Sequence, residues 1–342
     1  MNDPRRILVI RRRAIGDVLV SVDVLRALRE HWPQAEIVFV VDRPAVDMVR
    51  GSGLFDTLLV YDRATFNSGA PWQRLKATWH WLRRLRALRA DLVLDLLATP
   101  QTAIWTRWTG APVRVGPRMR KRSWAYTILV EPEQQPQFAG QRFLDWVRAL
   151  GVEPGLWRSH APLAAVEAAA RLQARDDARP LVILNSSATW PAKAWPLDCF
   201  AELARQLADS FDVRLTWGPG EEAARDRIVE AAQGSLAALP PTTMPELGAW
   251  LERAVLLVTT DSGPKHLAVA MGTATLTLFG STNPAGWQVP GGRHGGITQE
   301  VDCHPCNLTV CPVEGHPCLD QLSPSRVATK VRAMIAREDQ GG

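Results

Sequence analysis

Cysteine is scarce in this sequence, and long hydrophobic runs are absent. Five Cys among 342 residues are too few for a disulfide scaffold. No apolar run approaches the roughly 20 residues that a membrane-spanning helix needs. The N-terminal stretch MNDPRRILVIRRR also contains no hydrophobic region of a signal peptide. We therefore expect a protein that stays in the cytoplasm.

Lysine is scarce as well, because only 5 of the 40 basic residues are Lys. The charge is uneven along the chain: residues 1–155 hold 24 basic and 15 acidic residues, whereas residues 156–342 hold 16 and 20. A basic first half favours an acidic partner such as nucleic acid, anionic lipid or a phosphorylated sugar. The alternative is that the arginines reflect only an Arg-rich genome.

The hydrophobic content of 46% is that of an ordinary globular protein, and a chain of this length usually forms two domains. Short β-branched runs alternate with longer helical patterns, which is typical of βαβ units with parallel sheets. We predict two doubly wound α/β domains, 1–155 and 156–342, with a last helix that joins either one. Because such sheets bind ligands beyond the carboxyl ends of their strands, we expect a site in a cleft between the domains.

The predicted strands are short apolar runs, and the predicted helices are longer amphipathic segments. The strands are 7–10, 36–41, 58–61, 92–97, 113–115, 181–185, 213–217, 255–259 and 275–279, and the helices are 17–30, 44–49, 72–88, 102–108, 196–208, 221–232, 244–252, 264–271 and 324–338.

The first predicted strand runs into a loop that ends in Gly16 and Asp17 and opens a helix. Gly16 permits a tight turn, and Asp17 lies at or near the helix N-terminus. A carboxylate there is either a helix cap or a functional acid, and the local pattern favours the cap. The loop lacks the G-x-G-x-x-G pattern, which argues against a dinucleotide site in this domain.

A phosphate-binding pattern follows the predicted strand 181–185. Ser186, Ser187 and Thr189 supply hydroxyl groups, and Lys193 comes shortly before Pro196, which opens a helix. Hydroxyls, a compact cation and a helix N-terminus together suit a phosphate group. An exposed Lys is usually only solvated, but the rarity of Lys in this chain favours a function for Lys193.

Two acids, Glu221 and Glu222, follow a Gly-Pro-Gly turn after the predicted strand 213–217. Acids in the first turn of a helix are favoured by the helix dipole, and this stabilising effect alone is enough to explain one of the two. The other is placed to accept hydrogen bonds from the hydroxyl groups of a ribose.

The most informative segment is 261–266, with the sequence Asp-Ser-Gly-Pro-Lys-His. Ser262 and Gly263 stand where a helix begins and Pro264 lies in its first turn, so backbone N–H groups and a hydroxyl can hold a pyrophosphate. His266 lies one turn inside the helix, where a single His is more often a scaffold residue than a catalyst.

Together these motifs make the sequence similar to the heptosyltransferases of glycosyltransferase family nine. That family has the GT-B fold, with two doubly wound Rossmann-like domains facing a central cleft, and builds the inner core of lipopolysaccharide. The similarity covers nearly the whole chain and rests on segments 15–17, 191–196, 218–222 and 261–266, in the family's order. It implies an inverting, metal-independent transfer of heptose from ADP-heptose to lipopolysaccharide.

The resemblance also implies a role for each matching residue. Asp17 matches the general base, Lys193 the lysine that contacts the donor phosphate and sugar, and Glu222 the ribose-binding glutamate. Lys193 and the helix end would supply the positive charge that a metal supplies elsewhere. The other candidates for donor binding are Ser186, Ser187, Asp261, Ser262, Gly263 and His266.

The family's acceptors are phosphorylated and carboxylated oligosaccharides on lipid A, which implies peripheral contact with the inner-membrane surface. Arg groups match phosphate and carboxylate geometry, although charge runs are more often solvated surface. The tryptophans of the same half form either an apolar patch toward lipid or part of the core. The acceptor candidates are Arg63, Arg118, Arg120, Lys121 and Arg122, and the tryptophans are Trp72, Trp79, Trp81 and Trp124.

Four of the five cysteines, Cys303, Cys306, Cys311 and Cys318, lie within sixteen residues. In a cytosolic protein such clustering favours a metal over disulfides, and the initial C-x-x-C suits a structural Zn or Fe. The remaining spacings fit no common zinc module, and the alternative is a packed loop of reduced thiols.

Two other functions are considered. One is a GT-B glycosyltransferase that uses another nucleotide sugar or a different acceptor, such as a protein. The other is a nucleic-acid-binding protein, but that function leaves Asp17, Lys193, Glu222 and Asp261 unexplained, and the sequence has no known nucleic-acid motif. We therefore expect no nucleic-acid partner.

Overall fold

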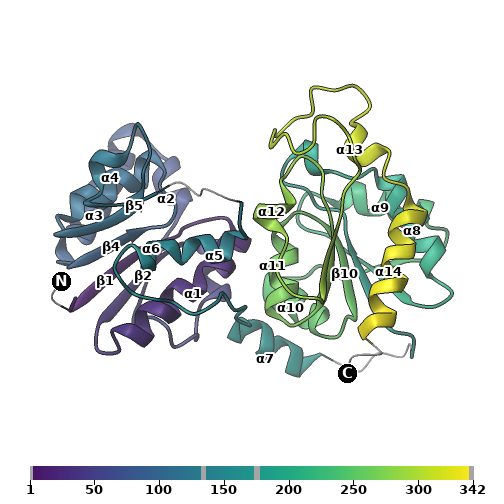
Figure 1. The fold of residues 1–342 in the computed structure, drawn as a ribbon, viewed down its shortest axis with the longest axis horizontal. Coiled ribbons are helices and arrows are strands. Elements are labelled where there is room, and N and C mark those ends of the chain that lie inside the picture. Colours follow the sequence, from purple (N-terminus) through teal and green to yellow (C-terminus); the bar gives the residue numbers. More distant parts are fainter. Residues whose placement is uncertain (1–2, 132–135, 173–177, 339–342) are drawn as a thin grey trace. The chain divides into compact units, whose positions relative to one another are not determined.

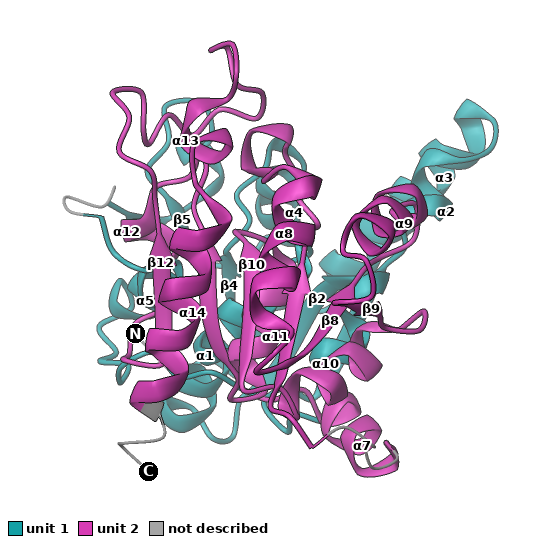
Figure 2. Ribbon diagram, turned by 90° about the vertical axis from the view of Figure 1, so that its right-hand side faces the viewer, with its two compact units in different colours: residues 1–160 teal, residues 161–342 magenta. Residues whose placement is uncertain are grey.

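The computed structural model describes residues 3–131, 136–172 and 178–338, and the chain divides into two compact units, 1–160 and 161–342 (Figures 1 and 2). Each unit holds a parallel six-stranded sheet with helices packed on it. The α/β class predicted from the alternating pattern is therefore confirmed. No helix of the described residues is long and apolar enough to cross a membrane.

Unit 1 has the strand order β3-β2-β1-β4-β5-β6. Its strands are β1 (Arg6–Ile10), β2 (Glu36–Asp42), β3 (Thr57–Tyr61), β4 (Leu92–Asp95), β5 (Val113–Pro117) and β6 (Ile128–Val130). Its helices are α1 (Ile15–His31), η1 (Arg43–Met48), α2 (Arg63–Asn67), α3 (Pro71–Ala87), α4 (Pro100–Thr109), η2 (Ser123–Ala125), α5 (Ala139–Phe143) and α6 (Asp145–Arg148), of which η1 and η2 are 3-10 turns.

Unit 2 has the strand order β12-β11-β10-β7-β8-β9. Its strands are β7 (Leu181–Asn185), β8 (Asp212–Thr216), β9 (Ala237–Ala238), β10 (Leu256–Thr260), β11 (Ala274–Leu278) and β12 (His294–Ile297). Its helices are α7 (Leu163–Arg171), the 3-10 turn η3 (Pro191–Lys193), α8 (Leu197–Leu207), α9 (Glu222–Ala231), α10 (Met244–Glu252), α11 (Gly263–Ala270), α12 (Pro284–Trp287), α13 (Pro317–Asp320) and α14 (Pro324–Glu338).

The two sheets have the same topology. Counted from the first strand of each unit, both have the order 3-2-1-4-5-6, and the order reverses between β1 and β4 in unit 1 and between β7 and β10 in unit 2. At such a switch point the loops after the two strands diverge to opposite faces of the sheet and leave a crevice for a ligand. The loops after β1, β4, β7 and β10 are therefore where functional side chains are expected.

Burial explains why the central strands are so apolar. Every side chain from Ile7 to Ile10 in β1 is 0% exposed, and β7 and β10 are buried along their whole length. A parallel strand covered on both faces needs a continuous apolar run rather than an alternating pattern. Helix α14 packs on α8, and its Val327 and Val331 belong to the core of unit 2.

The sequence-based assignment found the edge strand β3 but missed the other three edge strands of the two sheets. β6, β9 and β12 are only three, two and four residues long, and β12 has the sequence HGGI, which has little β propensity. The segment predicted as helix 44–49 is the 3-10 turn η1, and its three-residue period resembles an α-helical pattern over so short a segment.

A buried carboxylate closes the end of β4 at the switch point of unit 1. Asp95 is 0% exposed and accepts hydrogen bonds from the backbone N–H of Ala98 at 2.8 Å and from the Tyr126 hydroxyl at 2.9 Å. Burial raises the pKa of Asp95, and these hydrogen bonds oppose the shift. The Tyr126 hydroxyl thus satisfies an oxygen that water cannot reach.

Tyr126→Phe is expected to lower the free energy of unfolding by about 1–3 kcal/mol, because a buried carboxylate oxygen loses its donor. Urea unfolding measures the change. Tyr61→Phe is the matched control, since among the described residues the Tyr61 hydroxyl accepts only from Gln101, at 3.1 Å, and Gln101 is exposed. Equal losses for the two variants would contradict the role given to Tyr126.

Candidate functional site

The loops after β7 and β10 are joined by the amide of Asn185. This side chain is buried at the end of β7, and its Nδ2 donates to Thr259 Oγ1 at 2.9 Å and to Ser262 Oγ at 3.0 Å. The Thr260 hydroxyl donates to the carbonyl of Ser187. These bonds hold the two loops together at the switch point of unit 2.

A buried carboxylate between two lysines occupies the same place. Lys193 Nζ lies 3.1 Å from Asp261 Oδ2 and 3.2 Å from the Asp261 carbonyl oxygen. Lys265 Nζ donates to the other carboxylate oxygen and to the carbonyl of Trp287 at 3.0 Å. The side chain of Lys265 is 0% exposed and that of Asp261 is 3%, whereas that of Lys193 is 10%. Lys193 is therefore the member of this group that a ligand can reach.

The charges of this group favour an anion. Burial alone would raise the pKa of Asp261, but Lys265 and Lys193 outweigh it, and the pKa lies well below its ordinary value. The Asp261 carboxylate thus lies between the amino groups of two lysines. A buried charge is costly unless it is compensated, and Lys193 is the lysine of this group that can also offer its amino group to an anionic ligand.

The N-terminus of α11 adds to this preference. Ser262 is its N-cap residue, but the Ser262 hydroxyl is bonded to Asn185 and Thr259 rather than to the helix. Pro264 in the first turn has no N–H. The Ser262 side chain thus leaves the first backbone N–H groups of this helix uncapped, and such groups together with the helix dipole attract phosphate.

His266, on the same helix, is neutral. Burial, with a further contribution from Lys265, lowers its pKa to about 3. Its ring lies edge-on to Trp287 with centroids 6.1 Å apart, and its Nδ1 has no hydrogen-bond partner among the described residues. A buried imidazole that is neutral at neutral pH is suited to packing and to a single hydrogen bond rather than to charge transfer.

The two acids after β8 have different environments. Glu221 Oε2 accepts from the backbone N–H of Gly218 and from the Ser187 hydroxyl, both at 2.7 Å, and so closes the turn. Glu222 is exposed in the first turn of α9. Backbone N–H groups of Glu222 and Gly220 lower its pKa. Ser186, in the loop after β7, is half-buried.

The cysteine-rich segment packs behind the turn that carries Lys193. The Ala192 N–H donates to the Thr309 carbonyl, and the Ala192 carbonyl accepts from Ser281 N–H and from His316 Nε2, all at 3.1 Å. A Cβ atom at Gly280 would lie 2.6 Å from the Ala192 carbonyl oxygen, so only glycine permits this close approach. The segment therefore fixes the backbone next to Lys193.

The metal expected at this segment has no support in the structure. Cys303, Cys306, Cys311 and Cys318 line one cavity of about 120 Å³, but among the described residues no group of three or more His, Cys, Asp or Glu side chains is arranged to hold a metal ion. Burial and the three neighbouring thiols raise the pKa of Cys318 to about 11. Clustering in the sequence therefore does not by itself establish a metal site, and a structural metal stays unsupported by the described residues.

In unit 1, Asp17 forms part of the start of α1. Its Oδ1 lies 2.7 Å from Arg11 Nη2, and its Oδ2 accepts from the Ala14 N–H at 3.1 Å. The Asp17 side chain is 23% exposed and that of Arg11 is 9%. Burial lowers the pKa of Arg11, and Asp17 opposes the shift. The capping role is thus present, and the carboxylate still reaches the surface.

The acceptor candidates have different partners in the structure. Arg63 pairs with Asp42 at 2.8 Å, and Asp42 also pairs with the buried Arg12. Arg118 pairs with Glu131. The remaining candidates lie on the loop between β5 and η2: Arg120 and Lys121 are exposed, whereas Arg122 donates to the Ala98 carbonyl.

Several residues of these sites were not singled out from the sequence. Lys265 lies four residues after Asp261, a spacing that brings side chains together on a helix, and the rarity of Lys could have drawn attention to it. Asn185 carried no comparable signal, because its partners Thr259 and Ser262 lie far away in the sequence. Arg11 is one of three consecutive arginines, and nothing in the sequence singles out the one that pairs with Asp17.

Comparison with known proteins identifies the class. The model of glycosyltransferase family 9 (heptosyltransferase) matches residues 78–316. Lipopolysaccharide heptosyltransferase 1 of Pseudomonas aeruginosa is 25% identical over 360 aligned positions, covering 96% of this chain and 98% of the relative. The chain belongs to glycosyltransferase family 9, and it is a glycosyltransferase.

Solved structures agree with this fold. The ADP-heptose lipopolysaccharide heptosyltransferase II of Escherichia coli superimposes with a TM-score of 0.77 at 20% identity, over 98% of this chain and 99% of the other. Heptosyltransferase WaaC of E. coli, solved with ADP-2-deoxy-2-fluoro heptose, gives 0.73 at 22% identity, over 96% and 99%. The fold is GT-B, as the resemblance implied.

Acid is expected to destabilise the chain through His266. Below pH 6.5, the ordinary pKa of histidine, the His266 side chain takes up a proton in the unfolded chain. In the folded chain the same side chain stays unprotonated until about pH 3. The free energy of unfolding should therefore fall by about 1.4 kcal/mol per pH unit between these values. Urea unfolding at several pH values should show a shallower dependence for His266→Gln. His80→Gln, at an exposed position, should leave the dependence unchanged, and an unchanged slope in His266→Gln would refute the assignment.

Proposed function

We propose that this glycosyltransferase transfers heptose from ADP-heptose to the inner core of lipopolysaccharide, with inversion at the anomeric carbon. The observation that carries the proposal is the buried Asp261 carboxylate between Lys193 and Lys265 beside the uncapped N-terminus of α11. This arrangement suits the diphosphate of a nucleotide sugar. Family membership favours this function over nucleic-acid binding.

The donor is proposed to bind along the carboxyl edge of the sheet of unit 2. Lys193 and the backbone N–H groups at Gly263 would contact the diphosphate, and the exposed Glu222 would accept from the ribose hydroxyls. As the sugar leaves, negative charge grows on the phosphate, and fixed positive groups stabilise that charge. Asp261 would hold Lys193 in place rather than touch the donor, and we propose that no metal takes part in the reaction.

Asp17 is proposed to remove the proton from the acceptor hydroxyl. Its carboxylate is part-exposed at the switch point of unit 1, and Arg11 and the Ala14 N–H fix its orientation. A positioned carboxylate of this kind contributes typically 10²–10⁴-fold as a general base. Arg120 and Lys121, exposed after β5, are candidates for anionic groups of the acceptor. Because such acceptors are lipid-anchored, we place the reaction at the cytoplasmic face of the inner membrane.

Asp17→Asn is expected to lower kcat for heptosyl transfer by about 10²–10⁴-fold, because the amide cannot take up the acceptor proton. The amide oxygen can still accept from the Ala14 N–H, so ADP affinity should stay nearly unchanged. ADP release with heptose-deficient core acceptors measures kcat, and calorimetry measures ADP binding. Glu30→Gln, an exposed acid on the same helix, is the control. Full activity in Asp17→Asn would disprove the assignment.

Lys193→Met is expected to weaken ADP binding by about tenfold to a hundredfold, because one charge-assisted hydrogen bond to phosphate is lost. Lys330→Met, a half-buried lysine on α14 of the same unit, is the matched control and should bind ADP normally. If the parent chain binds ADP but transfers no heptose, the proposed donor site stands, and the enzyme uses another nucleotide sugar or another acceptor. Unchanged ADP affinity in Lys193→Met would refute the role of Lys193.

A further inference from the structure

The basic character of unit 1 is concentrated in one stretch. Residues 63–130 hold 13 Lys and Arg but only 2 acids, Asp91 and Asp95. Asp95 is fully buried, and one oxygen of Asp91 accepts the backbone N–H groups of Arg5 and Arg6 at 2.8 and 2.9 Å. The exposed charged side chains of this stretch are therefore all cationic.

Helix α3 has an apolar side that the core does not use. Trp81 and Leu85 are buried in the core of unit 1. On another side Trp72, Leu75 and Trp79 are 65%, 72% and 49% exposed. Their spacings of three and four place them in one row along the helix. Arg83 and Arg86 continue the row, and both are exposed.

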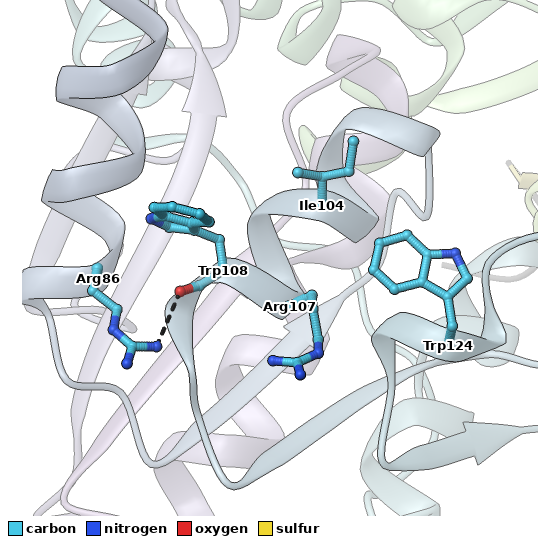
Figure 3. Close-up of a pocket in the computed structure, with 5 residues that line it drawn as sticks. All are labelled: Arg86, Ile104, Arg107, Trp108 and Trp124. Atoms are coloured by element: carbon cyan, nitrogen blue, oxygen red, sulfur yellow. Dashed lines mark hydrogen bonds between the residues drawn. The ribbon is translucent and has the colours of Figure 1, made fainter.

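The exposed apolar surface continues onto α4 and η2. The rings of Trp79 and Trp108 are in contact, with centroids 5.7 Å apart. A hollow of about 470 Å³ next to them is lined by Arg86, Ile104, Arg107, Trp108 and Trp124, and in Figure 3 Arg107 lies between the two indoles. Arg86 donates to the Trp108 carbonyl at 3.3 Å, which holds α3 and α4 together at this edge.

Single exposed apolar residues are common on proteins, but these form a connected set among cations. Arg74, Lys76, Arg83, Arg84 and Arg107 are all exposed, and none of them pairs with a carboxylate among the described residues. Indole rings favour the boundary between lipid tails and headgroups, and Lys and Arg favour anionic headgroups. Aliphatic Leu75 and Ile104 offer no stacking face to the bases of a nucleic acid.

We propose that this α3–α4–η2 surface, made of Trp72, Leu75, Trp79, Ile104, Trp108 and Trp124 with the surrounding Arg and Lys, binds an anionic phospholipid bilayer. The apolar side chains enter the headgroup region, and the cations contact lipid phosphates. The proposal rests on the membrane location given above, but it does not depend on which sugar is transferred, because binding is measured without donor or acceptor.

The test is sedimentation of the full chain with vesicles of phosphatidylglycerol and phosphatidylethanolamine, and with vesicles of phosphatidylcholine alone. We expect binding to the anionic vesicles only, and weaker binding in high salt. Trp72→Ser with Leu75→Ser removes the two most exposed side chains of the row without touching the core. This double variant should lower the partition coefficient by about tenfold or more. Arg74→Gln with Arg83→Gln should do the same and flatten the salt dependence.

Matched controls lie elsewhere in unit 1. Leu156→Ser changes an aliphatic residue that is 81% exposed, and Arg50→Gln changes an exposed arginine outside the surface; both should bind vesicles like the parent chain. ADP affinity and the urea midpoint should be unchanged in every variant. Failure of the parent chain to bind anionic vesicles would overturn the membrane location. If the Trp72/Leu75 variant binds vesicles like the parent chain, the assignment of bilayer binding to this surface is wrong. The assignment is also wrong if the parent chain binds single-stranded RNA in preference to vesicles.

Discussion

The burial of one carboxylate between two lysines is the interaction on which the candidate donor site depends. Asp261 has almost no contact with water, so its charge is tolerable only because Lys193 and Lys265 lie against it. Each lysine has a distinct part in the arrangement. Lys265 is enclosed and anchors the carboxylate to α11, whereas Lys193 retains a path to solvent. The amino group of Lys193 then lies where a phosphate can approach.

The sheet topology brings these residues together from distant parts of the chain. Lys193 follows β7 and Asp261 follows β10, which are neighbouring strands at the point where the order reverses. The cysteine-rich segment follows β12 at the edge of the same sheet, yet its backbone reaches Ala192. One turn beside Lys193 is thus held from several directions, and the exclusion of any side chain at Gly280 is part of that support.

Much of this could be predicted from the sequence, and the exceptions have physical causes. Buried parallel strands such as β1 and β7 leave continuous apolar runs, so the fold class was predictable. Short edge strands such as β9 leave no such run. Lys193 and Asp261 stood out as polar residues after strands, but the pairing of Asp261 with two lysines depends on geometry. The cysteine spacing suggested a metal, whereas the direction of the thiols is set by packing that the sequence does not display.

The proposed bilayer-binding surface also offers a reason for the charge asymmetry of the chain. From the sequence, the excess of arginine in the first half was equally compatible with genome composition. Genome composition affects both units and both sides of a helix alike. It therefore does not explain why α3 has an exposed apolar row in addition to its buried side, or why residues 63–130 have no exposed acid. An exposed row of Trp and Leu is costly in water, and arginines beside it add only local repulsion. Both the exposed apolar row and the repulsion between arginines are explained if this surface binds an anionic bilayer. There the apolar side chains leave water and the arginines contact lipid phosphates.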